Sequence, residues 1–380
     1  MSVQDLTPRG QIVRSPYPDE AASTMNRSPR GTGGRRQARP DMTEEETSDA
    51  LRRLWRTEHA VVYPDLDPGI DAVQWVLERL LRHSESVFVP IYGEAGEKLA
   101  EICERLGSDV ITAEQERGAV FEQEDLIAEL RRRKPSMLIV AHGDPSTGQL
   151  QPLDELGRVC RELDILFLVD VSATAGDVPI RADAWHIDAI LTGHGHRLHL
   201  PLDLQPIAYN EQIEVRLRGR RLDVESGSGK LRQRPNGFPA KEANGIHGSS
   251  VAADVEIANR IEGRSRHAEA LLSGLVALGL RLFGSSASRL PTMVCVVVPE
   301  GIDGESVRSR LSAEHGIEIG GKPPSLGTDI WRLEVLDGIA NREAVARMLQ
   351  SFEAALAAEG FLCAFGSGAL AASRYYEQLA

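Results

Sequence analysis

Residues 137–171 read MLIVAHGDPSTGQLQPLDELGRVCRELDILFLVDV, and this stretch decides the fold class. Two apolar runs, at 137–141 and 166–171, flank an amphipathic segment at 153–162. Short runs rich in Val, Ile and Leu are typical of parallel strands that are buried on both faces, and the segment between them is typical of a crossover helix. The stretch therefore predicts a β-α-β unit and an α/β protein.

The same alternation continues on both sides of this unit. We expect further strands at 87–92, 110–112, 189–192 and 206–209, and helices at 72–82, 95–106 and 124–133. Such alternation predicts a large domain, residues 43–248, in which helices sandwich a mostly parallel sheet. Ligands of such sheets bind at the carboxyl ends of the strands, so the functional residues should follow the apolar runs.

The remaining sequence predicts a smaller α+β domain, residues 249–359, and a C-terminal tail, residues 360–380. A long helical pattern begins near residue 249. Strands are expected at 294–298 and 330–335, and helices at 305–315 and 342–358. The two strands and the helices beside them are enough for a compact second unit with its own core.

Composition limits the classes of function. The 380 residues carry a net charge of −13, which argues against a nucleic-acid partner for the folded body. The sequence shows neither an apolar run of membrane-spanning length nor a secretion signal, which predicts a cytoplasmic protein without membrane contact. The four cysteines are scattered, without a C-x-x-C pair for zinc, and are interpreted as small core residues.

The N-terminus differs from the acidic body. Residues 1–40 hold seven Arg against three acidic residues, with five prolines and little apolar periodicity. This composition predicts a disordered basic tail over residues 1–42. It can be interpreted as a docking arm for an acidic partner or as a solvated extension.

Three motifs carry a resemblance to a known family. They are HGDPSTGQLQPL at 142–153, FLVDVSATAGDVPI at 167–180 and DAILTGHGHRL at 188–198. Their order and spacing resemble the class V aminotransferases of pyridoxal-phosphate fold-type I, of the alanine:glyoxylate and serine:pyruvate type, over residues 50–358. The resemblance implies a dimer, pyridoxal 5'-phosphate as cofactor, and small amino acids or 2-oxo acids as substrates.

The resemblance also implies roles for individual residues. Asp170 would face the pyridine nitrogen, the hydroxyls of Ser146 and Thr147 would approach the cofactor ring, and His142 would line the pocket. Arg332 in the motif IWRL would bind the α-carboxylate of the substrate, for which a planar guanidinium is well suited.

Each of these residues also has a plain structural interpretation. Asp170 can be a helix cap or a strand-end residue, and the S-T-G sequence can be a tight turn that needs Gly148. Arg332 can be a surface residue at a strand edge, and His142 a satisfied buried histidine.

The sequence departs from the family where the covalent chemistry takes place. In the family a Lys follows the strand at 189–192 and bonds to the cofactor, and His196 stands in that place here. An imidazole does not replace an amine in that bond, and Arg197 is too basic to do so. The chain has five Lys in all, and none is near this strand end in the sequence. These are Lys98, Lys134, Lys230, Lys241 and Lys322.

Two further positions are altered. The family binds the phosphate with a Gly- and Ser-rich loop at a helix start, and the corresponding stretch here is PDLDPGID at 64–71, in which Gly69 alone keeps that character. Its carboxylates repel a dianion, and its prolines remove N–H donors. The bulky aromatic that stacks on the ring in the family is Ala95 here.

Three hypotheses follow. The first is a pseudoenzyme that keeps the fold and dimer, for example as the partner subunit of a catalytic paralogue, and has lost transamination. The second is an active enzyme of the family that binds pyridoxal or pyridoxamine phosphate noncovalently, with His196 as the proton carrier. The third is a repurposed pocket with metal-assisted or acid/base chemistry at His194, His196 and His199, near Asp203.

Overall fold

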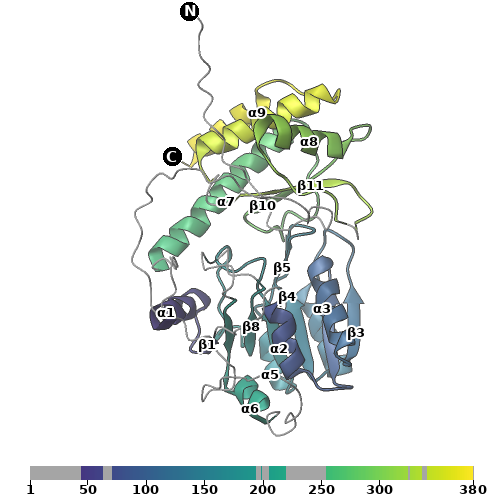
Figure 1. The fold of residues 1–380 in the computed structure, drawn as a ribbon, viewed down its shortest axis with the longest axis vertical. Coiled ribbons are helices and arrows are strands. Elements are labelled where there is room, and N and C mark those ends of the chain that lie inside the picture. Colours follow the sequence, from purple (N-terminus) through teal and green to yellow (C-terminus); the bar gives the residue numbers. More distant parts are fainter. Residues whose placement is uncertain are drawn as a thin grey trace, which may run out of the picture. The chain divides into compact units, whose positions relative to one another are not determined.

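The computed structural model of the chain describes residues 44–62, 71–193, 198, 205–219, 254–323, 326–335 and 340–379 (Figure 1). These residues form two compact units. The larger one extends to Ile261 and includes Ser285–Leu290, whereas the smaller one consists of Glu262–Gly284 and the residues from Pro291 onward. The predicted basic tail and the predicted domain boundary at residue 248 lie outside the described residues.

A seven-stranded sheet forms the centre of the larger unit, counted over the described residues, in the order β1-β9-β8-β7-β4-β2-β3. The strands from β3 to β8 in this order are parallel, β9 is antiparallel to β8, and β1 is antiparallel to β9. The bounds are β1 Ala60–Val62, β2 Ser86–Ile91, β3 Asp109–Glu114, β4 Met137–Ala141, β7 Leu166–Asp170, β8 Ala189–Leu191 and β9 Ile207–Tyr209. The predicted α/β class with a mostly parallel sheet is confirmed.

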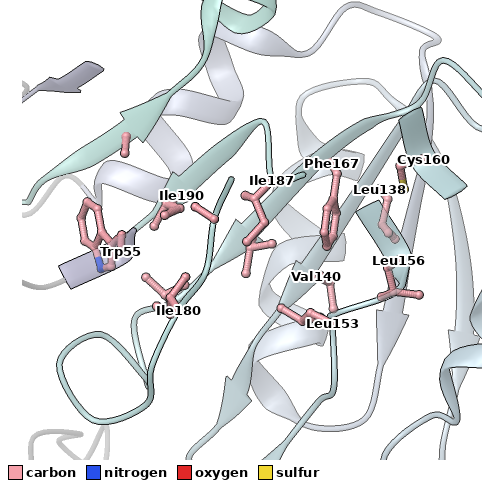
Figure 2. Packing of buried hydrophobic residues seen from close by; sticks show 14 of the residues in the cluster. Trp55, Leu138, Val140, Leu153, Leu156, Cys160, Phe167, Ile180, Ile187 and Ile190 are labelled. Carbon is pink, nitrogen blue, oxygen red and sulfur yellow. The ribbon is translucent and has the colours of Figure 1, made fainter. Parts of the chain in front are cut away.

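Helices cover both faces of this sheet because its strands alternate apolar side chains. Leu138 and Val140 point into one core cluster, and Met137 and Ile139 point into the other. The first cluster packs against α1 (Glu44–Trp55), α4 (Gln123–Arg133) and α5 (Leu156–Glu162), and the second against α2 (Ala72–Leu80), α3 (Glu94–Arg105) and α6 (Glu211–Gly219). Figure 2 shows the first cluster, in which the Phe167 ring lies among aliphatic side chains.

The smaller unit is built on an antiparallel pair of strands, β10 (Met293–Val297) and β11 (Ile330–Glu334). Its helices are α8 (Gly304–His315), α9 (Arg342–Ala358), α10 (Ser367–Gln378) and the part of α7 (Asp254–Ala277) that begins at Glu262. Trp331 and Phe352 meet edge to face at 5.4 Å in its core, and Tyr376 of α10 is buried in the same cluster. The strands and helices predicted for 294–358 are therefore present.

No helix in the described part of the chain combines the length and the apolar composition that a membrane crossing requires.

Candidate functional site

The carboxyl ends of three neighbouring parallel strands define one edge of the large sheet. Ala141 of β4 pairs with Asp170 of β7, and Asp170 pairs with Leu191 of β8. Residues that follow these three strands therefore lie next to one another, although they are far apart in the sequence. This edge is where an open α/β sheet binds its ligands.

Asp170 is the acidic residue at this edge. Its carboxylate accepts hydrogen bonds from the backbone N–H of Ser172 at 2.9 Å and from the Ser172 hydroxyl at 2.5 Å. The same hydroxyl accepts a hydrogen bond from the backbone N–H of Gly193 at 2.6 Å, which ties the residue after β8 to the end of β7. Burial raises the pKa of Asp170, although the Ser172 hydrogen bonds oppose this shift.

A short hairpin carries the predicted S-T-G turn. Its strands β5 (Gly143–Asp144) and β6 (Gln149–Leu150) are antiparallel, and Gly148 has a φ of 70° in the left-handed region. The backbone N–H of Gly148 donates to the Asp144 carbonyl at 2.8 Å. The interpretation of this motif as a tight turn that needs glycine is therefore confirmed.

Asp144, at the start of this turn, is fully buried and holds the two predicted hydroxyls. Its carboxylate accepts from the Thr147 backbone N–H at 2.9 Å, from the Thr147 hydroxyl at 3.2 Å and from the Ser146 hydroxyl. Ser146 and Thr147 thus lie at the strand-end edge as predicted, and both hydroxyls donate to Asp144. Asp144 was not among the residues predicted from the sequence.

The Asp144 carboxylate also caps the start of α3. Gly93 precedes this helix and has no side chain to cap it, so the Asp144 carboxylate accepts from the Ala95 N–H at 2.8 Å and the Ser146 hydroxyl accepts from the Glu94 N–H at 3.2 Å. A Cβ atom on Gly93 would overlap the Asp144 carboxyl group. The hairpin therefore caps α3 from a distance, and only glycine fits at position 93.

Tyr92 connects this region to β4. Its hydroxyl donates to the Ala141 carbonyl at 2.8 Å, and the side chain is fully buried. Burial, followed by the nearby charges of Asp144 and Asp170, raises the pKa of Tyr92, so the phenol stays protonated and keeps this hydrogen bond. Sequence reasoning missed this residue because a Tyr after an apolar run is typical of any buried strand.

His142 lies on the other side of the sheet from the Asp170 carboxylate. Side chains alternate along a strand, so His142 shares the face of Val140 in the first core cluster, whereas Asp170 shares the face of Leu168 in the second. Its Nδ1 is 3.0 Å from the Thr174 hydroxyl, and its ring meets Trp185 edge to face at 5.8 Å. Burial lowers the pKa of His142 to about 4, so the ring is neutral at neutral pH.

The start of α2 is the second polar region at the strand ends. Asp71 is its N-cap, and the carboxylate accepts from the N–H groups of Val73 at 2.8 Å and Gln74 at 3.3 Å. The N–H of Ala72 donates to the side-chain oxygen of Gln205 at 2.8 Å. These three donors at the beginning of the helix are therefore all paired within the chain.

Lys98 of α3 reaches this point. Its ammonium lies 3.0 Å from the Asp71 carboxylate. A Cβ atom on Gly193 would be 3.3 Å from the same carboxylate and 3.1 Å from the Ser172 hydroxyl, so Asp71 approaches the segment after β8. One of the five lysines thus comes close to the strand end in space, although none is near it in the sequence. The pairing of Asp71 with Lys98 was missed, because it depends on the packing of α2 against α3.

The structure does not describe most of the other predicted site residues. Gly69, His194, His196, His199 and Asp203 are outside the described residues. Among the residues that the structure does describe, no group of three or more His, Cys, Asp or Glu side chains is arranged to hold a metal ion. Arg332 belongs to the smaller unit, where it pairs with Gly320 of the same unit and its Nε donates to the Gly321 carbonyl at 2.9 Å.

Known proteins are similar to this chain in fold and in sequence. The family model described as "Aminotransferase class-V" matches residues 69–321. The chain is 34% identical to the (S)-ureidoglycine–glyoxylate transaminase of Bacillus subtilis (strain 168), and the match covers 82% of each chain. It is 29% identical to the alanine–glyoxylate aminotransferase of Callithrix jacchus, covering 82% of this chain and 79% of the relative. The crystal structure of ureidoglycine-glyoxylate aminotransferase from Bacillus subtilis superimposes with a TM-score of 0.75 at 32% identity, covering 88% of this chain and 89% of that one.

The mostly parallel sheet with helices on both faces therefore has the fold of the aminotransferases of pyridoxal-phosphate fold-type I. Within that class, the chain belongs to the class V aminotransferase family. The predicted family is confirmed.

The described residues fit the cofactor that this fold implies on one side only. A partly buried carboxyl at the end of β7 suits a protonated pyridine nitrogen, and Asp170 supplies it. The phosphate side does not fit, because the N–H donors at the start of α2 are already paired and the carboxylate of Asp71 stands among them. The described residues as a whole therefore do not form a complete site for pyridoxal 5'-phosphate.

Proposed function

We propose that this protein keeps the class V aminotransferase fold, has lost cofactor-dependent amino transfer, and acts as a pseudoenzyme. The observation that carries this proposal is the sequence after β8, TGHGHRLHLPLDLQ at 192–205, which has no Lys and places His196 where the family has its lysine. The pairing of Leu191 with Asp170 supports this alignment, because it places the start of the segment directly after a strand that lies beside Asp170.

The role that remains for such a chain is binding. We infer that it assembles as a dimer, either with a second copy or with a catalytic paralogue, and that in the second case it is a partner subunit. The retained core supports this inference, because the described residues of the larger unit pack helices against both faces of the sheet. A fold kept without its chemistry still offers its surfaces for assembly.

An amino-transfer assay tests the proposal. The purified chain is incubated with alanine or serine as donor, glyoxylate as acceptor and added pyridoxal 5'-phosphate. We expect no transfer above that of the free cofactor. A catalytic class V relative assayed in parallel is the control. Transfer that follows the concentration of this chain and survives its separation from contaminating enzymes would overturn the proposal.

A second function is favoured by the retained Asp170. A partly buried carboxyl held by Ser172 is what noncovalent binding of the cofactor ring would need, and the relative with 34% identity is named for transfer to glyoxylate. In this case the chain would act on a small amino acid and a 2-oxo acid, with His196 carrying the proton. Asp170→Ala would then abolish a measured activity with pyridoxamine phosphate, whereas a pseudoenzyme has no such activity to lose.

A further inference from the structure

We infer that Asp71 is an internal anion: its carboxylate occupies the position at the start of α2 that a bound phosphate group would need, and Lys98 is its counter-ion. In this fold the phosphate of the cofactor is expected at a helix start, where free N–H groups and the helix dipole favour a negative charge. The structure fills that position with a side chain of the protein.

The N–H donors at the start of α2 are already used by the protein itself. A phosphate would need the N–H groups of the first helical turn. Val73 and Gln74 donate theirs to Asp71 at 2.8 and 3.3 Å, and Ala72 donates to Gln205 at 2.8 Å. A phosphate could take these donors only by displacing the carboxylate that already accepts from them.

The charges of Asp71 and Lys98 also disfavour a bound phosphate. The Lys98 ammonium, 3.0 Å from the Asp71 carboxylate, balances the charge that a bound anion would otherwise balance. The Asp71 side chain is 19% exposed, so the carboxylate is largely enclosed by the protein. A phosphate dianion that entered beside it would meet a like charge at short range, which disfavours binding.

Another helix of the same chain provides the comparison. Asp303 caps α8 in the same way, accepting from the N–H groups of Glu305 at 3.0 Å and Ser306 at 3.2 Å. Its carboxylate also accepts from the Ser306 hydroxyl, so the contacts that the structure gives it all come from the first turn of α8. Asp303 is thus an ordinary cap, whereas Asp71 is a cap joined to a lysine from a second helix at the strand ends.

The experiment measures binding of three probes by isothermal titration calorimetry: inorganic phosphate, pyridoxamine 5'-phosphate and pyridoxamine. Pyridoxamine 5'-phosphate has no aldehyde, so it does not label surface lysines, and pyridoxamine reports the contribution of the ring alone. The proteins are the full chain and its variants Asp71→Ser, Asp71→Ser with Lys98→Met, and Asp303→Ser. Serine keeps the capping hydroxyl and removes the charge, so each variant should fold.

We expect Asp71→Ser to bind both phosphate probes at least about tenfold more tightly than the unaltered chain, which is the size of effect expected for a charge near a helix start. Adding Lys98→Met should remove most of the gain, and Asp303→Ser should show none. Pyridoxamine should bind all four proteins equally. The inference would be overturned if a folded Asp71→Ser variant bound inorganic phosphate and pyridoxamine 5'-phosphate no more tightly than the unaltered chain does. Thermal unfolding shows whether the variants are folded, and Asp71→Asn is the second variant if Asp71→Ser is not.

The inference rests on the proposed function, for which it provides a cause apart from residue 196, yet the two can fail separately. Amino transfer by the unaltered chain would overturn the proposed function and would not change the titration of Asp71→Ser. Absence of a phosphate gain in Asp71→Ser would overturn the inference and leave the assay for amino transfer as it was.

Discussion

Two regions at the same edge of the sheet differ in what they keep. At the end of β7, Asp170 remains a partly buried carboxyl that accepts hydrogen bonds from Ser172, and such a group suits a pyridine nitrogen. At the start of α2, Asp71 and Gln205 take the helix donors that a phosphate would need. One half of the site thus keeps a carboxyl that suits a pyridine nitrogen, whereas the N–H donors of the other half are already paired within the chain. Under our proposal, binding of the cofactor therefore fails at the phosphate before any chemistry is reached.

The largest effect on stability is expected from Gly93→Ala, which disturbs the Asp144 turn in the half of the site that contains Asp170. The new Cβ overlaps the Asp144 carboxyl group, which must then move away from the N–H of Ala95 at the start of α3. We expect a loss of about 3 kcal/mol in the free energy of unfolding, measured in urea. Gly263→Ala is the matched control: a Cβ atom at this position of α7 would have no neighbouring atom within 4 Å, and alanine there should stabilise by about 0.5 to 1 kcal/mol. Equal stability of Gly93→Ala and the unaltered chain would contradict the contact.

The next effect concerns His142, on the opposite face of the same strand ends. Its pKa of about 4 in the folded protein is below the ordinary value, so the unfolded chain binds the proton more tightly. The stability due to this group is therefore complete above about pH 6.5 and is lost as the pH falls toward 4, by at most about 3 kcal/mol. Urea unfolding of the unaltered chain and His142→Gln between about pH 4.5 and 7.5 should show a steeper fall for the unaltered chain. Parallel curves would refute this assignment.

Asp170→Asn sharpens the comparison at the ring-nitrogen side. Burial raises the pKa of Asp170, so this carboxyl holds its proton more tightly in the folded protein than in the unfolded chain. The stability from this group is present below the pKa of the unfolded carboxyl and is lost as the pH rises through the raised folded value. Asparagine does not ionise, so we expect Asp170→Asn to gain stability relative to the unaltered chain as the pH rises. A difference in stability that is the same at acidic and neutral pH would show that the carboxyl is not buried in this way.

The smallest effect is expected for the Lys98 ion pair. The Lys98 side chain is 61% exposed, so Lys98→Met should lower the free energy of unfolding by less than about 1 kcal/mol. Lys322, whose ammonium lies 3.1 Å from Asp329 in the smaller unit, is the matched control, and Lys322→Met should behave alike. A loss of several kcal/mol for Lys98→Met alone would mean that this pair holds the fold together and is more than a counter-ion to Asp71.

Much of the fold could be predicted because strands and crossover helices follow from local patterns. The strand β4 was predicted and found at 137–141, and β8 is one residue shorter than predicted. The position of Asp170 at a strand end followed from the apolar run before it. Alternation along β4 could also have shown that His142 faces away from Asp170.

The remaining features depend on contacts between distant residues. Asp144 caps a helix that begins 50 residues earlier, at Glu94, and Lys98 pairs with Asp71 across two helices. Neither contact has a local signal, because Asp144, Asp71 and Lys98 are polar residues that would suit an exposed position equally well. The sequence therefore indicated that the phosphate loop was altered, and the structure was needed to show that Asp71 pairs with Lys98 at this point.

The proposed loss of covalent cofactor chemistry is tested most directly by borohydride reduction of the unaltered chain after incubation with pyridoxal 5'-phosphate, followed by peptide mass analysis. We expect no stoichiometric adduct on any lysine, with Lys98 labelled no more than the exposed, ion-paired Lys322. A single stoichiometric adduct, whether on Lys98 or on another lysine, together with the absorbance of a protein-bound cofactor, would contradict this account.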